Sequence, residues 1–414
     1  MTETGSDMGR IEVSIGRLGH QGDGIAPGPI FVPRTLPEEV VSGMPSGDRL
    51  DDVRIVTPSD QRVAPPCRHY KACGGCQLQH ASDGFVAGWK RDFVAGALGA
   101  QDIETDVRPV STSPAQSRRR ATLAVRRTKK GALAGFHGRA SDTITPIPDC
   151  LLLDPALIRA IPMVEALAPV GGSRKGTLSV TLTRAENGLD VAVGGGKPLD
   201  RALERDLGAF AETHRLARLT WDGETVAMRE PPTQRFGRAV VVPPPGAFLQ
   251  ATDQGENDLL KGVRDIIGGA KRIADLFAGC GTFTLPLAET AEVLAVEGEA
   301  DMIAALDRGW REAPGLKKVT AVARDLFRRP LMPDELAKLD AVVIDPPRAG
   351  AEAQVREIAV SDVPVVAYVS CNPVTFARDA RILCDAGFRL DHVNVVDQFR
   401  WSVHTELVAS FRRG

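Results

Sequence analysis

Long hydrophobic runs are absent from this sequence of 414 residues. No stretch approaches the roughly 18 consecutive apolar residues that a membrane-spanning helix requires, so no membrane partner is expected. The N-terminal segment MTETGSDMGR is polar and lacks the apolar core of a secretory signal, which predicts a cytoplasmic protein. Internal repeats and low-complexity segments are absent as well, in agreement with a globular composition of 43% hydrophobic and 25% charged residues.

Cysteine is scarce, with seven residues in the whole chain. An odd number of cysteines in a long chain without a secretory signal argues against a disulfide framework and favours metal binding or catalysis.

A strong excess of charge is also lacking, because the net charge is only −2, which by itself suggests no nucleic-acid partner. Basic residues are nevertheless concentrated in residues 107–140, which contain no Asp or Glu. This basic stripe predicts a surface that binds RNA phosphates, and the alternative is a solvated hairpin face. Its members are Arg108, Arg118, Arg119, Arg120, Arg126, Arg127, Lys129, Lys130 and Arg139.

The chain divides into three regions by pattern. Residues 1–58 predict a small β-module of the oligonucleotide-binding type, because short strands at 11–15, 30–33 and 53–56 alternate with glycine-rich turns. Residues 59–240 predict a central α+β domain with a hairpin, formed by segments 122–125 and 132–136, in the basic stripe. Residues 241–414 alternate apolar strands with helical segments, which predicts a doubly wound α/β sheet. The expected strands are 273–277, 293–297, 319–323, 341–344, 365–369, 390–396 and 407–411.

A glycine-rich turn after the first of these strands predicts a cofactor site. Gly279 and Gly281 allow backbone to approach a ligand, and Glu297 at the end of the next strand can reach ribose hydroxyls. A nicotinamide site would normally carry a third glycine where Thr284 stands. Asp275 just before the turn disfavours a pyrophosphate and favours a ligand with a cationic amino-acid end, which indicates S-adenosylmethionine.

Two later strand ends carry reactive side chains. Asp345 and Cys371 follow the fourth and fifth strands, so they should meet at the ligand-binding edge of the sheet. A thiolate that adds to carbon 6 of uracil would turn carbon 5 into a nucleophile for methyl transfer. A base must then remove the proton from carbon 5, and Glu406, just before the last strand, is the predicted base. The alternatives are a small buried cysteine and a surface carboxylate.

A cysteine-rich segment at residues 67–76 predicts a metal centre. Cys67, Cys73 and Cys76 have the spacing C-x5-C-x2-C among glycines, and Cys150 is a candidate fourth ligand. Four thiolates suit either zinc or an iron–sulfur cluster, and the spacing alone slightly favours zinc. The methyl transfer outlined above needs no electron transfer, so a structural role is expected for either group.

Together these features resemble the RNA 5-methyluridine methyltransferase family, in its iron–sulfur branch, over nearly the whole chain. The segments that carry the resemblance are GRLGHQGDGIA (16–26, similar to a TRAM domain), the cysteine segment 67–76, DLFAGCGTF (275–283), DPPRAG (345–350), SCNP (370–373) and HTE (404–406). The resemblance implies a class I methyltransferase fold with a seven-stranded sheet, and S-adenosylmethionine as cofactor. It also implies an RNA substrate, for which 23S ribosomal RNA is favoured over transfer RNA, and a monomer is expected.

The resemblance also implies a role for individual residues. A [4Fe–4S] cluster on Cys67, Cys73, Cys76 and Cys150 replaces the preference for zinc, Cys371 is the nucleophile, and Glu406 is the base. Contacts to the cofactor are implied for six residues, namely Gln250, Phe277, Thr282, Glu297, Asp325 and Asp345. Gln250 has no other signal in the sequence.

The chain departs from the family pattern at two places. The TRAM-like region is shortened before the cysteine segment, so the resemblance does not carry over its contribution to RNA binding. Thr282 stands where relatives often have Asn. An RNA 5-methylcytosine methyltransferase is disfavoured because Pro347 and Arg348 stand where such enzymes carry a second cysteine. A catalytically inactive, cluster-bearing RNA-binding protein is disfavoured by the presence of both Cys371 and Glu406.

Overall fold

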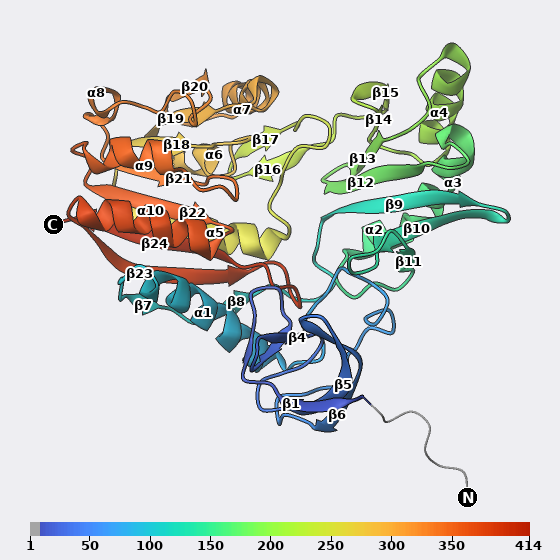
Figure 1. Cartoon of the computed structure of the whole chain (residues 1–414). Coiled ribbons are helices and arrows are strands. Elements are labelled where there is room, and N and C mark those ends of the chain that lie inside the picture. The colour runs from blue at the N-terminus through green and yellow to red at the C-terminus, as the bar shows by residue number, and fades with distance from the viewer. Residues whose placement is uncertain (1–8) are drawn as a thin grey trace, which may run out of the picture.

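The computed structural model describes residues 9–414 of the chain (Figure 1). These residues form sheets of six, seven and nine strands and a two-stranded hairpin. Residues 1–8 of the predicted module 1–58 lie outside the described part. Within residues 9–414, no helix combines the length and the apolar character needed to cross a bilayer. All seven cysteines are free thiols, as expected for a chain without a disulfide framework.

The N-terminal region is a six-stranded sheet with the order β1-β5-β6-β4-β3-β2. Its two edge strands are separated in the chain by only Ile15 and Gly16, whose N–H groups donate to Glu39 O and Ile25 O respectively, both at 2.9 Å. The sheet therefore curls back on itself around an apolar core that includes Ile15. Its strands are β1 (Ile11–Ser14), β2 (Arg17–Leu18), β3 (Gly24–Ala26), β4 (Ile30–Val32), β5 (Val40–Ser46) and β6 (Arg49–Thr57). The TRAM-type assignment stays a prediction.

The central region is a seven-stranded sheet with helices α3 and α4 packed on it. The predicted basic hairpin is present, since Thr128 pairs with Gly131 across a turn formed by Lys129 and Lys130. The strands are β9 (Arg120–Thr128), β10 (Gly131–His137), β11 (Ile144–Pro146), β12 (Thr177–Ala185), β13 (Gly188–Gly194), β14 (Arg218–Trp221) and β15 (Glu224–Met228). The helices are α2 (Pro155–Arg159), α3 (Ile161–Gly171) and α4 (Arg201–Thr213), and the hairpin of β16 (Gln234–Phe236) and β17 (Ala239–Val241) follows.

The C-terminal region contains all seven predicted strands in the order β20-β19-β18-β21-β22-β24-β23. The first five pair in parallel and β24 runs antiparallel to its neighbours. Their bounds are β18 (Arg272–Leu276), β19 (Glu292–Glu297), β20 (Val319–Ala323), β21 (Ala341–Ile344), β22 (Val365–Ser370), β23 (Phe388–Asp397) and β24 (Glu406–Arg413). The helices are α5 (Asp253–Ile267), α6 (Thr284–Leu287), α7 (Ala300–Glu312), α8 (Pro333–Leu336), α9 (Glu352–Ala359) and α10 (Pro373–Asp385).

Helices cover both faces of this C-terminal sheet, which explains the uninterrupted apolar strands. Val342 and Ile344 of β21 belong to one core together with residues of α9 and α10. Ala341 and Val343 of the same strand belong to a second core together with residues of α5. Successive strand residues point to opposite faces, so a strand buried on both sides must be apolar at every position.

The structure differs from the predicted division 59–240 at its beginning. Helix α1 (Asp83–Gly99) packs against α10, and the short strands β7 (Asp106–Val107) and β8 (Ser111–Thr112) pair in parallel with β23. Residues 83–112 therefore extend the C-terminal sheet rather than the central one. Lys90 of α1 secures this attachment, because its Nζ lies 2.6 Å from Oδ1 of Asp397 and both side chains are almost fully buried.

Candidate active site

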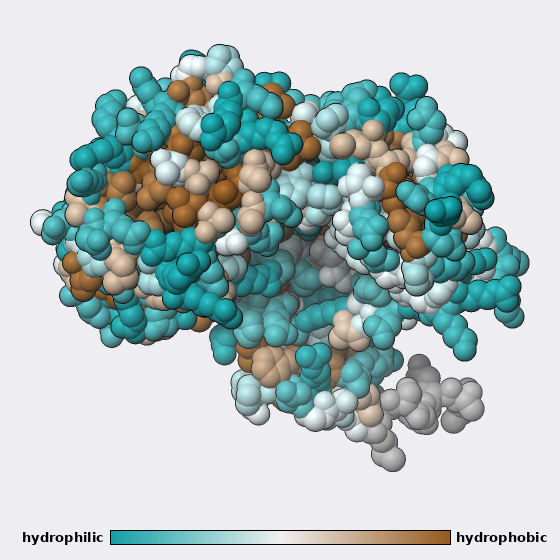
Figure 2. Space-filling view, turned by 90° about the horizontal axis from the view of Figure 1, so that it is seen from above, coloured by the Kyte–Doolittle hydropathy of each residue, from teal (hydrophilic) through white to brown (hydrophobic). Residues whose placement is uncertain are grey.

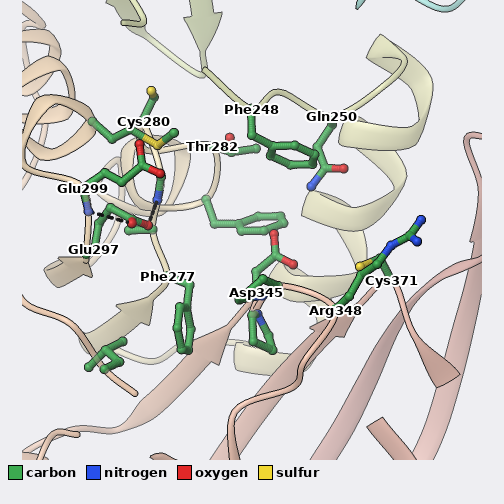
Figure 3. Close-up of a pocket in the computed structure, with 18 of the residues that line it drawn as sticks. Phe248, Gln250, Phe277, Cys280, Thr282, Glu297, Glu299, Asp345, Arg348 and Cys371 are labelled. Carbon is green, nitrogen blue, oxygen red and sulfur yellow. Dashed lines mark hydrogen bonds between the residues drawn. The ribbon is translucent and has the colours of Figure 1, made fainter. Parts of the chain in front are cut away.

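One large cavity opens where strands β18, β19, β21 and β22 end (Figure 3). Its volume of about 560 Å³ lies within the range of small-molecule binding sites. In doubly wound folds, ligands generally bind at the carboxyl edge of the parallel sheet. The structure places all eight predicted cofactor and catalytic residues on the wall of this one cavity: Gln250, Phe277, Thr282, Glu297, Asp325, Asp345, Cys371 and Glu406.

The glycine-rich turn between β18 and α6 forms one wall of the cavity. Phe277, Gly279 and Gly281 all have positive φ, of 62°, 55° and 97°, so the chain turns sharply here. Glu297 braces the turn, since its Oε2 accepts from Gly279 N at 3.0 Å and its Oε1 accepts from Glu299 N at 3.0 Å (Figure 3). A carboxylate has about four acceptor positions, so Glu297 keeps lone pairs for a ligand hydroxyl.

Three carboxyl groups concentrate negative charge beside this turn. Burial raises the pKa of Asp275 to about 7. The charge of Glu297 raises this pKa further, and the hydrogen bond from Thr284 lowers it. Burial, followed by the charges of Asp275 and Glu297, raises the pKa of Asp345 to about 7 as well. Neighbouring carboxyl groups repel one another when they are ionised, and a cationic ligand relieves this repulsion. The residues therefore fit the positively charged methionine end of S-adenosylmethionine.

Cys371 is held rigidly between β22 and α10. Asn372 caps the helix, because its Oδ1 accepts from Val374 N at 3.1 Å, and its Nδ2 donates to Arg348 O at 3.0 Å. The second bond ties the cysteine loop to the loop that begins at Asp345. Burial, followed by the charges of Glu406 and Asp345, raises the pKa of the Cys371 thiol to about 11, while Arg348 lowers it.

Glu406 is buried at the start of β24, which pairs with β22 so that Leu407 lies opposite Ser370. This antiparallel register brings Glu406 beside the strand end that carries Cys371. Burial, followed by the charge of Asp345, raises the pKa of Glu406 to about 8. A carboxyl group whose pKa lies near neutrality is suited to accept and release a proton.

Four other side chains on the cavity wall were assigned no role from the sequence: Arg348 and His404, which lie in the DPPRAG and HTE segments, and Phe248 and Phe327. Arg348 Nη2 lies 3.1 Å from His404 Nδ1, and burial together with the charge of Arg348 lowers the pKa of His404 to about 4. Neutral His404 is therefore a poor proton donor at physiological pH. Phe248 and Phe327 line the cavity and are both exposed. Solvent-facing aromatic rings at a cavity mouth were not predicted because each is isolated in the sequence.

The four predicted metal ligands line a second, small and mostly apolar cavity: Cys67, Cys73, Cys76 and Cys150. Burial raises the pKa of Cys76 to about 12, and the other three cysteines raise it further. All four cysteines therefore lie around one small cavity. No group of three or more His, Cys, Asp or Glu residues within 9–414 is arranged to hold a metal ion. The metal assignment stays a prediction.

Comparison with known proteins gives the family. The profile of the tRNA (uracil-5-)-methyltransferase family matches residues 317–412. An uncharacterized RNA methyltransferase of Brucella suis is 43% identical, with 99% of each chain covered. A 23S rRNA (uracil(1939)-C(5))-methyltransferase of Shewanella baltica is 31% identical, with 97% of this chain and 95% of that protein covered.

The fold agrees with that of a solved relative. The tRNA (uracil-54, C5)-methyltransferase of Pyrococcus abyssi, crystallised with S-adenosyl-L-homocysteine, superposes with a TM-score of 0.76. The alignment covers 98% of this chain and all of the other, at 23% identity, which supports a shared class I methyltransferase fold. The chain therefore belongs to the RNA uracil-C5 methyltransferase family, and it is an S-adenosylmethionine-dependent enzyme that methylates carbon 5 of uracil in RNA.

Proposed function

We propose that the protein methylates a uridine of 23S ribosomal RNA by a covalent mechanism in which Cys371 is the nucleophile and Glu406 is the base. The choice of RNA rests on the Shewanella baltica relative, which is named for 23S rRNA and aligns over almost the whole chain. The mechanism rests on one observation, namely that a thiol and a buried carboxyl with raised pKa line the same cavity as the carboxylates suited to the cofactor.

The proposed chemistry proceeds in two steps. Cys371 Sγ bonds to carbon 6 of the uracil, and the electrons of the ring double bond make carbon 5 nucleophilic. When bound, the cofactor would supply an electrophilic methyl group, to which carbon 5 would bond while the sulfonium sulfur keeps the electrons of the bond that breaks. Glu406 then takes the proton from carbon 5, the carbon–sulfur bond breaks, and the ring double bond returns while the thiolate is released. The target uracil must leave any base stack to reach this cavity.

The strongest test compares Cys371→Ala and Glu406→Gln on unmodified RNA with the unmutated enzyme on RNA that contains 5-fluorouridine. Cys371→Ala should bind cofactor and RNA but transfer no methyl group. Glu406→Gln should accumulate a covalent RNA–protein complex that survives denaturation, because the proton at carbon 5 has no acceptor. The unmutated enzyme should form the same complex with 5-fluorouridine, since fluorine cannot leave as a cation. Cys384→Ala is the matched control, because Cys384 lies in α10 and contacts the hydrophobic core instead.

The second candidate substrate is transfer RNA. The matching family profile and the Pyrococcus abyssi structure are both named for tRNA methyltransferases. Mapping 5-methyluridine in ribosomal and transfer RNA from cells that lack the protein separates the two. Loss of one 5-methyluridine from 23S rRNA alone would support the proposal, and loss from tRNA alone would overturn the choice of ribosomal RNA.

We also propose that the four cysteines of the small cavity hold a [4Fe–4S] cluster. The cavity is lined by Phe136, Ile147 and Tyr70 as well as the thiols, and a dry, apolar surrounding suits a cluster held by thiolates. The group would tie residues 67–76 to the loop around Cys150 and serve to stabilise the fold. Zinc on the same thiols is the alternative.

RNA is proposed to bind across the hollow between the three regions of the chain, which Figure 2 shows as a largely hydrophilic surface. The basic stripe contributes only in part, because several of its members are engaged inside the protein. Arg119 is buried and pairs with Asp253 and Glu256, and Arg139 pairs with Asp23. Lys129 and Lys130 at the hairpin tip are exposed and remain the best candidates to contact phosphates.

A further inference from the structure

A buried glutamine, Gln398, connects two walls of the cavity from behind. It follows β23 directly and is 2% exposed. We propose that Gln398 is a positioning residue that fixes the carboxamide of Gln250 with its amino group facing the cavity and holds the Glu406 carboxyl beside it. This inference rests on the proposed function, because it assigns how the cavity recognises an acceptor oxygen and how the base is positioned.

The orientation of the Gln398 carboxamide follows from its backbone partner. Ala251 N lies 2.7 Å from Gln398 Oε1, and a backbone N–H can only donate. The oxygen of Gln398 must therefore face Ala251, and its amino group faces the other way. That amino group donates to Gln250 Oε1 at 2.6 Å. One backbone N–H thus sets the orientation of two side-chain amides in sequence.

The consequence for the cavity is that Gln250 presents only hydrogen-bond donors. Its oxygen is occupied by Gln398, and its nitrogen points toward the cavity and Asp345 (Figure 3). A donor at this place suits an acceptor oxygen on whatever binds there. Two groups can provide this acceptor oxygen: the carboxylate of the cofactor and a carbonyl of the uracil. The binding experiments below distinguish them.

Gln398 also acts on the proposed base. A hydrogen bond from its side chain lowers the pKa of Glu406, which opposes the larger increase caused by burial. Glu406 lies opposite Val396 in the pairing of β23 with β24, so Gln398 follows closely after the residue that faces the base. Gln398, which orients Gln250, therefore lies near Glu406 as well, and its side chain favours the ionised form of that carboxyl.

The surroundings leave Gln398 little freedom to rotate. The residue before it, Asp397, is held by its buried ion pair with Lys90 at 2.6 Å and accepts from Phe399 N at 3.0 Å. On the other side, helix α5 approaches closely at Gly255, where an added Cβ would lie only 2.6 Å from Gln398 Cβ. A side chain packed this tightly keeps one rotamer.

Substitution of Gln398 tests the inference. Gln398→Met keeps the volume and removes the hydrogen bonds to Ala251 and Gln250 as well as the effect on Glu406. Gln398→Glu offers an acceptor to Gln250 and so turns the oxygen of Gln250 toward the cavity. We expect kcat/KM to fall at least tenfold in Gln398→Met and further in Gln398→Glu. The pH profile for resolution of the methylated adduct should also move to higher pH in Gln398→Met, because the side chain that lowers the pKa of Glu406 is lost.

The matched control is Gln354→Met in α9. Gln354 is fully buried, accepts from Leu331 N at 2.8 Å and donates to Leu331 O at 3.1 Å, so the variant loses comparable bonds away from the cavity. It should lower thermal stability and leave the pH profile in place.

Two binding measurements identify the acceptor. If the Kd for S-adenosylhomocysteine rises in both Gln398 variants, Gln250 serves the cofactor carboxylate. If that Kd is unchanged while adduct formation with 5-fluorouridine RNA slows, Gln250 serves the uracil.

The inference is overturned if both Gln398 variants match the Gln354 control in kcat/KM and pH profile. It is separable from the proposed function, because the proposed function is tested on the unmutated enzyme, by its formation of 5-methyluridine and of an adduct with 5-fluorouridine RNA.

Discussion

The pH dependence of methylation is a direct test of the roles assigned to Glu406 and Cys371. Burial is the main cause that raises the pKa of Glu406 to about 8 and that of Cys371 to about 11. Glu406 must be ionised to accept a proton, and Cys371 must be a thiolate to attack carbon 6. Each group must lose a proton to act, so activity should rise with pH through the neutral and alkaline range.

The two values predict the shape of the profile. Attack and methyl transfer need only the thiolate, so log kcat/KM should rise with a slope of about 1 below the pKa of Cys371. Resolution of the methylated adduct needs ionised Glu406, so its rate should rise with a slope of about 1 and level off at a break near pH 8, the pKa of Glu406. Between about pH 7 and about pH 9 the ionised fraction of Glu406 grows about tenfold and the thiolate fraction of Cys371 about 100-fold.

The assay follows single-turnover reactions with a 23S rRNA fragment and measures separately the rate of methyl transfer and the rate at which the methylated adduct resolves, the second giving the profile with the break. The control is Glu406→Gln, in which the rate of adduct formation with 5-fluorouridine RNA should keep a slope of about 1 without a break, since Gln does not ionise. A wild-type profile without a break near pH 8, or the same break in Glu406→Gln, would refute the assignment of the base.

Three further changes have defined outcomes. Protein purified without oxygen should be brown, and Cys150→Ser should lose its iron; colourless protein with stoichiometric zinc would contradict the cluster. Replacement of Lys129 and Lys130 by Ala should weaken RNA binding and reduce the salt slope of log Kd by about 1 to 2, with cofactor affinity unchanged; equal RNA affinity at low salt would show a merely solvated hairpin. Lys90→Met leaves the Asp397 carboxylate buried and unpaired, so the free energy of unfolding should fall by about 3–5 kcal/mol in urea titrations, and a loss below about 1 kcal/mol would contradict the importance of this pair.

The sequence by itself determined the architecture of the C-terminal region. Its seven strands are uninterrupted apolar runs because both faces of the sheet are covered, and this local composition is visible without any coordinates. The side chains of Asp345 and Cys371 were placed at one edge for the same reason, since parallel strands end on the same side. The hairpin around Lys129 and Lys130 was also visible, because a short turn between two strands is a local feature.

Only the tertiary structure decided the features that depend on partners distant in the chain. Helix α1 joins the C-terminal sheet through Lys90, whose partner Asp397 lies about 300 positions away. The basic stripe divides into internal ion pairs, such as that of Arg119 with Glu256, and exposed lysines, although all of them look alike in the sequence. Gln398 became visible only as a link between Gln250 and Glu406. Charge pairing, burial and amide orientation depend on which segments lie next to each other in the folded chain, and residue type alone does not reveal those neighbours.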